Sequence, residues 1–165
     1  MADNQFIEID APHLCVMEGE SEELCNDGIY GKALAQYLQS HLISLGYDVP
    51  CIVCEDWGWY VPAETSGFRI ALCVYGFPQH NQEAMATNST DPDGAAIDPY
   101  SELPGTPLSL CVTIGTQPRK YWDWRKFRRI DRSHMIAKLM QDLISIFESD
   151  SQVAILGVTN EFPLG

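Results

Sequence analysis

Strict alternation marks residues 68–75, which read Phe68-Arg69-Ile70-Ala71-Leu72-Cys73-Val74-Tyr75. Apolar side chains at every second position are typical of a strand that buries one of its faces. Two shorter extended segments, residues 49–54 and 57–61, precede this strand. Parallel strands need long crossover connections, and the connections between these three segments are short. The sequence therefore predicts an antiparallel meander.

Two helices are predicted on either side of this meander. In residues 27–45, Leu34, Leu38 and Leu42 recur at the spacing of one buried helix face, and Gly46 can end the helix. A second apolar stripe begins after Asp131, which is a suitable N-cap. This stripe predicts a helix that starts near Asp131 and includes Phe147.

Three further apolar runs, residues 13–17, 108–114 and 152–158, have the composition of strands. The predicted order is strand, helix, three strands, long loop, strand, helix, strand. This order predicts the α+β class. We expect a mixed or mainly antiparallel sheet of about five to six strands, with both helices packed on one face.

The chain of 165 residues is long enough to bury its own core, and we expect residues 1–165 to form a single domain. Residues 76–107 are rich in Pro, Gly, Asn, Asp and Ser and predict a long loop. Loops of this length are commonly functional or disordered. We expect this one to act as a mobile flap.

Positive charge is concentrated in one part of an acidic chain. The total charge is −13, yet eight of the ten Lys and Arg residues lie within residues 119–138, opposed there by two carboxylates, Asp123 and Asp131. An acidic protein repels nucleic acid and anionic membranes at long range and attracts basic proteins. We therefore expect a basic protein partner, nucleic acid only through a local patch at residues 119–132, and no membrane partner.

The main functional hypothesis is a non-enzymatic protein-binding module that meets a basic partner through surface carboxylates. An inhibitor or immunity-type protein that acts on a nucleic-acid-handling partner would present carboxylates where phosphates otherwise bind. The binding carboxylates are expected in the acidic stretch that follows Met17 and in the long loop. They are Glu18, Glu20, Glu22, Glu23, Asp91, Asp93 and Asp98.

The alternative hypothesis is a small enzyme or ligand-binding domain with a pocket at Glu55-Asp56-Trp57-Gly58-Trp59, covered by the long loop. Adjacent carboxylates can divide acid and base roles where their surroundings separate their pKa values. A turn with exposed acids and buried tryptophans accounts for the same residues. The candidate pocket residues are Glu55, Asp56, Trp57 and Trp59.

The basic stretch 119–129 interleaves cations with four aromatic residues, a mixture found in single-stranded nucleic acid sites. The favoured interpretation is different: Trp122, Trp124 and Phe127 enter the core, and the cations stay outside. A third interpretation is a docking site for anionic ligands or for a second copy of the chain. Its binding residues would be Arg125, Arg128 and Arg129.

No metal or cofactor is expected. Cys51 and Cys54 have a Cys-x-x-Cys spacing, but in a strand residues three apart face opposite ways. The four histidines are scattered without ligand spacing. We expect all six cysteines to be buried or half-buried thiols. Because no export signal or membrane-spanning run is visible, we expect a cytoplasmic protein of bacterial type.

Overall fold

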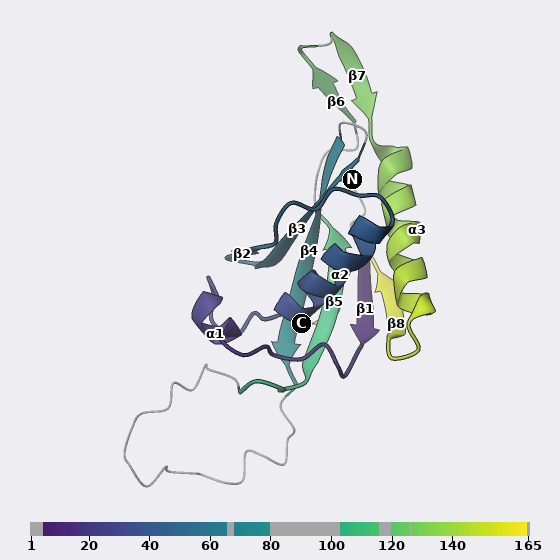
Figure 1. Cartoon of the computed structure of the whole chain (residues 1–165). Helices are drawn as coiled ribbons and strands as arrows, with labels where there is room; N and C mark the ends of the chain where they lie inside the picture. The colour runs from purple at the N-terminus through teal and green to yellow at the C-terminus, as the bar shows by residue number, and fades with distance from the viewer. Residues whose placement is uncertain (1–4, 66–67, 80–102, 116–119, 126, 165) are drawn as a thin grey trace, which may run out of the picture.

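The computed structural model describes residues 5–65, 68–79, 103–115, 120–125 and 127–164 (Figure 1). Within these ranges, the helices are α1 (Glu20–Glu23), α2 (Lys32–Ser44) and α3 (Ser133–Ser149). The main sheet contains β1 (Phe6–Asp10), β2 (Val53–Glu55), β3 (Gly58–Thr65), β4 (Phe68–Pro78), β5 (Leu108–Ile114) and β8 (Ala154–Thr159). A separate two-stranded sheet is formed by β6 (Lys120–Asp123) and β7 (Arg128–Asp131).

The main sheet has the strand order β2-β3-β4-β5-β1-β8, and all of its described pairs are antiparallel. This confirms the predicted α+β class, the predicted sheet of mainly antiparallel strands and the meander from β2 to β4. The first strand of the chain enters the sheet between β5 and β8. The first strand of the chain, β1, and the last, β8, therefore lie next to each other at one edge of the sheet.

One face of the sheet and the two long helices form the hydrophobic core. Across adjacent strands, Val74, Val112 and Ile7 are register partners on this face, and all three are buried. Alternation in β4 produces this face, because Ile70, Leu72 and Val74 pack inward. Leu34 and Leu38 of α2 and Leu143 of α3 belong to the same cluster. Figure 1 shows both long helices on this side of the sheet.

Several predicted boundaries are wrong. The apolar run at residues 13–17 is not a strand, because Val16 exchanges backbone hydrogen bonds with the loop at Gly105 and Thr106. α2 begins at Lys32 and not at residue 27, since Gly28 and Gly31 take φ values of 83° and 130°, which no right-handed helix allows. The strands β1, β6 and β7 and the short α1 were not predicted.

The predicted loop does not begin at residue 76, because the preceding strand extends beyond that position. β4 continues to Pro78, and Gln79 still donates its backbone N–H to the carbonyl of Pro107 (2.9 Å). Residues 80–102, for which mobility was predicted, lie outside the described residues. Within the described ranges, no helix has the length and apolar composition required to cross a membrane.

Candidate functional site

The two acidic runs singled out in the sequence lie against each other. The backbone N–H of Cys25 donates to Cys54 Sγ (3.3 Å), and the Cys25 thiol donates to the Cys54 carbonyl (3.2 Å). The Asn26 side-chain amide donates to the Asp56 carbonyl (3.1 Å). The chain after α1 therefore lies on the turn between β2 and β3 (Figure 1). We call the resulting surface the acidic end. It consists of Glu18, Glu22, Glu23, Asp27, Glu55 and Asp56, and all six residues are exposed.

Little positive charge compensates the acidic end. Lys32 Nζ contacts Glu23 Oε1 at 2.5 Å. The remaining five carboxylates of the acidic end make no ion pair with any described residue. The surface therefore has an unbalanced negative charge that can attract a cationic partner.

Glu20 is not part of this surface, and the expectation that it is a surface acid is wrong. Its side chain is completely buried. Glu20 Oε1 accepts the backbone N–H groups of Gly31 (2.9 Å) and Lys32 (2.7 Å), and Oε2 accepts that of Met17 (3.0 Å). Because the N-cap residue Gly31 has no side chain, Glu20 caps α2 from outside the helix. Glu20 therefore links Met17 to the start of α2 and is not available on the exposed surface.

The segment around Gly58 forms a tight turn in which Glu55 and Asp56 are exposed to solvent. Trp59 is buried in the core, while Trp57 is half-buried and has its ring 6.1 Å from that of Tyr75. Gly58 has φ 146°, and a Cβ at this position would lie 2.4 Å from the carbonyl oxygen of Val74. Glycine is therefore required here. Trp59 acts as a core residue, whereas Glu55 and Asp56 belong to the acidic end.

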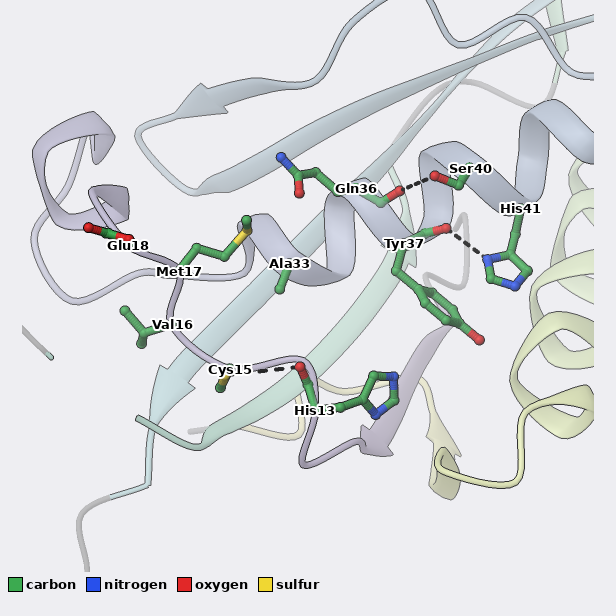
Figure 2. Close-up of a pocket in the computed structure, with 10 residues that line it drawn as sticks. All are labelled: His13, Cys15, Val16, Met17, Glu18, Ala33, Gln36, Tyr37, Ser40 and His41. Atoms are coloured by element: carbon green, nitrogen blue, oxygen red, sulfur yellow. Dashed lines mark hydrogen bonds between the residues drawn. The ribbon is translucent and has the colours of Figure 1, made fainter. Parts of the chain in front are cut away.

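A groove adjoins the acidic end (Figure 2). Its volume is about 490 Å³, and it lies between the segment 13–18 and the outer side of α2. Glu18 belongs both to the groove and to the acidic end. The residues that line the groove are His13, Cys15, Val16, Met17, Glu18, Ala33, Gln36, Tyr37, Ser40 and His41.

Four polar side chains gather at the end of the groove away from Glu18. The Tyr37 hydroxyl donates to Asp150 Oδ2 (3.1 Å), and His13 Nε2 lies 3.9 Å from the same oxygen. The His41 ring lies 4.2 Å from the Tyr37 ring, and Figure 2 shows both histidines beside that ring. The backbone N–H of Gln152, the Tyr37 hydroxyl and the two histidines lower the pKa of Asp150. Burial and the bond to Asp150 raise the pKa of Tyr37 to about 12. At neutral pH, Asp150 is therefore ionised and Tyr37 is protonated.

Sequence reasoning missed this cluster. Tyr37 and Asp150 are 113 positions apart, so only tertiary structure brings them together. The one local signal was the spacing of four between Tyr37 and His41, which places both side chains on one helix face. In the described ranges, no group of three or more His, Cys, Asp or Glu side chains is arranged to hold a metal ion.

The β6–β7 hairpin contradicts the favoured interpretation of the basic stretch. Trp122, Trp124 and Phe127 are 48%, 75% and 77% exposed. They do not enter the core, because the hairpin projects beyond the main sheet (Figure 1). Ile130 of β7 is buried. The aromatic side chains of Trp122 and Trp124 contact each other edge to face, with ring centres 6.0 Å apart.

Three cations of the hairpin have no ion-pair partner among the described residues. Arg125, Arg128 and Arg129 are exposed and form no ion pair with another described residue. Lys120, by contrast, lies 3.4 Å from Asp131. The three candidate loop acids, Asp91, Asp93 and Asp98, lie outside the described residues.

All six cysteines are free thiols, but their placement differs from the expectation. Cys25 and Cys51 are exposed, whereas the others are half-buried or buried. Cys54 contacts Cys25 from the other acidic run, and burial raises the pKa of the Cys54 thiol. A half-buried thiol with a raised pKa is a poor nucleophile at neutral pH.

Comparison with known proteins finds no relative of this chain: no protein family, no curated protein and no solved structure matches it.

Proposed function

We propose that this chain is a non-enzymatic protein-binding module whose acidic end captures a basic protein. The observation that supports this function is the contact between the two acidic runs through Cys25, Cys54 and Asn26. This contact brings the chain after the first acidic run against the second run, and five carboxylates of the acidic end have no ion-pair partner among the described residues. Complementary charge speeds the encounter of two proteins and selects against partners of the wrong sign.

The groove supplies the apolar contact that a stable interface also needs. Interfaces combine an apolar centre with a polar rim. Met17 and Tyr37 contribute apolar surface to the groove, while Glu18 lies at one end and the ionised Asp150 lies near the other. An extended basic segment of the partner fits this arrangement, with its cations directed toward the two carboxylates.

A partner that handles nucleic acid fits this chemistry best. Such proteins bind phosphates through clusters of Lys and Arg. Carboxylates that occupy the same cationic surface exclude the nucleic acid. The chain would then act as an inhibitor or immunity-type protein.

The test is affinity capture from nuclease-treated bacterial lysate with matched variants. The acidic-end variant contains Glu18→Gln, Glu22→Gln, Glu55→Gln and Asp56→Asn. The control variant removes four exposed acids elsewhere, with the substitutions Asp10→Asn, Asp48→Asn, Glu148→Gln and Glu161→Gln. Each set removes four negative charges, so a difference between the variants reports position and not total charge.

We expect the natural chain and the control to retain the same basic proteins at about 50 mM NaCl and to lose them at about 300 mM NaCl, where screening is strong. The acidic-end variant should retain none of them. Calorimetry with the purified partner should then show binding at least about 10-fold weaker for a Gln36→Trp variant, which fills the groove without a change of charge. Equal capture by both charge variants would refute the proposal.

A further inference from the structure

The β6–β7 hairpin projects from the other end of the molecule from the acidic end (Figure 1). We infer that this hairpin binds single-stranded nucleic acid. Bases stack on Trp122 and Trp124, and Arg125, Arg128 and Arg129 neutralise the phosphates. This inference does not depend on the proposed function, because the two surfaces share no residue.

The exposed aromatic residues of the hairpin do not serve the fold. Trp124 and Phe127 are each at least three-quarters exposed, so they contribute little buried area. Phe127 also has φ 47°, a left-handed conformation that bulky residues rarely adopt. Strained residues of this kind concentrate at functional sites. A ligand contact explains why aromatic residues occupy these positions.

The strand register places a ring and a cation on one face. Trp122 is the cross-strand partner of Arg129. Side chains directly opposite each other in an antiparallel pair point to the same side of the sheet and lie within contact distance. Nonspecific single-strand sites have this pairing of a stacking platform with a neighbouring positive charge.

The acidic body does not cancel the potential of the hairpin. Strands of four residues extend roughly 13 Å. The Debye length at physiological salt is about 8 Å. The arginines near the tip are therefore largely screened from the negative charge of the body.

Two other anionic partners fit the hairpin less well. In the sequence, Arg125 and Lys126 stand between Trp124 and Phe127. Insertion of these aromatic residues into a membrane would carry both cations into hydrocarbon, at a high cost. In duplex DNA, the base faces are stacked on each other and are not available to Trp122 and Trp124. Unpaired bases expose the faces that these rings can cover.

Fluorescence anisotropy with labelled oligo-dT and oligo-U of about 15 nucleotides tests the inference, since a single site spans about 4–16 nucleotides. We expect a dissociation constant on the order of 1–100 μM at about 50 mM NaCl. Three phosphate contacts predict binding about 20-fold weaker at about 200 mM NaCl. The two oligonucleotides distinguish DNA from RNA as the natural ligand. Quenching of tryptophan fluorescence should accompany binding to either of them.

Two variants separate stacking from charge. Trp122→Ala with Trp124→Ala should weaken binding at least about 5-fold and leave the salt dependence unchanged. Arg125→Gln with Arg128→Gln and Arg129→Gln should weaken binding and remove most of the salt dependence. The charge-matched control contains Lys32→Gln, Arg69→Gln and Lys138→Gln, which remove three cations elsewhere, and it should bind like the natural chain. Thermal melting verifies that every variant is folded.

Competition distinguishes the other partners. We expect duplex DNA, polyglutamate and vesicles of phosphatidylserine and phosphatidylcholine to displace the oligonucleotide at least about 10-fold less effectively than unlabelled oligo-dT. Equal displacement by polyglutamate would indicate a generic anion site and overturn the inference. Preferential binding of duplex DNA or vesicles would overturn it too, as would unchanged affinity of the tryptophan variant.

Discussion

Glu20 holds the N-terminus of α2 with a side chain that comes from another element. A buried carboxylate is costly unless its oxygens are hydrogen-bonded. Here both oxygens accept backbone N–H groups, and the negative charge lies at the positive end of the helix. Its neighbours Glu22 and Glu23 are exposed. In one short helix, Glu20 therefore stabilises the fold, whereas Glu22 and Glu23 contribute charge to the surface.

The substitution Glu20→Gln should lower the free energy of unfolding by about 1–3 kcal/mol. The glutamine loses the charge and one of the two acceptor oxygens, so a buried N–H group is left without a partner. Urea unfolding followed by circular dichroism measures the change. The control Glu22→Gln alters an exposed residue and should change stability by less than about 0.5 kcal/mol. Equal stability of the two variants would contradict the capping role.

Gly58 fixes the turn that presents Glu55 and Asp56. We expect Gly58→Ala to destabilise the protein by at least about 3 kcal/mol, because its Cβ meets the Val74 carbonyl and its φ of 146° strains any other residue. The matched control is Gly157→Ala in β8, where a Cβ meets nothing within 4 Å. That variant should be unchanged or about 0.5 kcal/mol more stable. Denaturant melts of both variants test the difference.

Elements differ in how well the sequence predicted them. β5 was predicted with its observed bounds, and β4 was recognised, because both strands face a core along their whole length and their pattern is complete. The β6–β7 hairpin was misread, because exposed aromatic residues look like core residues in a sequence. β1 was missed, and a strand was wrongly predicted at residues 13–17, since that run is as apolar as a strand although Val16 pairs with a loop.

The hairpin itself yields a stability prediction. Phe127→Gly should raise the free energy of unfolding by up to about 1 kcal/mol relative to Phe127→Ala, because glycine relieves the left-handed strain. Neither variant should be less stable than the natural chain by more than about 0.5 kcal/mol, because Phe127 is exposed. Thermal melts measure both. A large loss in either variant would show that the ring packs against the protein.

In the whole molecule, the two faces of the sheet have different coverings. The helices cover one face. On the other face, Phe162 from the C-terminal segment contacts the rings of Phe6 (5.6 Å), Tyr75 (5.1 Å) and Phe77 (6.1 Å). Tyr75 is the register partner of Cys111 on this face. Ionisable groups are thus part of a mainly apolar layer.

This layer predicts a loss of stability in alkali. Burial raises the pKa of Cys73 to about 11 and the pKa values of Cys111 and Tyr75 to about 12. The folded state therefore retains protons that the unfolded chain releases above about pH 9, and stability must fall as pH rises from there toward 12. Each thiol should cost about 1 kcal/mol by pH 10.5.

Urea midpoints at pH 8, 9.5 and 10.5 measure this loss. The urea midpoint of the variant Cys73→Ala should fall less between pH 9 and pH 10.5 than that of the natural chain. The midpoint of Cys51→Ala, at an exposed position, should fall as much as that of the natural chain. If the urea midpoint of the natural chain did not change between pH 8 and pH 10.5, the raised pKa values of Cys73, Cys111 and Tyr75 would be contradicted.

Charge is separated in the folded molecule as the sequence indicated, but not completely. Arg69 and Lys138 pair with Glu64 and Asp142, so these cations are neutralised locally. Arg125, Arg128 and Arg129 of the hairpin, and five of the six carboxylates of the acidic end, have no such partner in the described ranges. The unbalanced charges therefore lie at two different ends of the molecule.

The sequence by itself determined the α+β class, the antiparallel meander, the faces of the two long helices and the uneven charge. These depend on periodicity and composition, which are local properties. Only the tertiary structure decided that Glu20 is buried, that the two acidic runs meet, that Tyr37 reaches Asp150 and that the hairpin aromatic residues stay in solvent. Each of these depends on which distant segment packs nearby, because burial and pairing are properties of neighbours in space and not of neighbours in the chain.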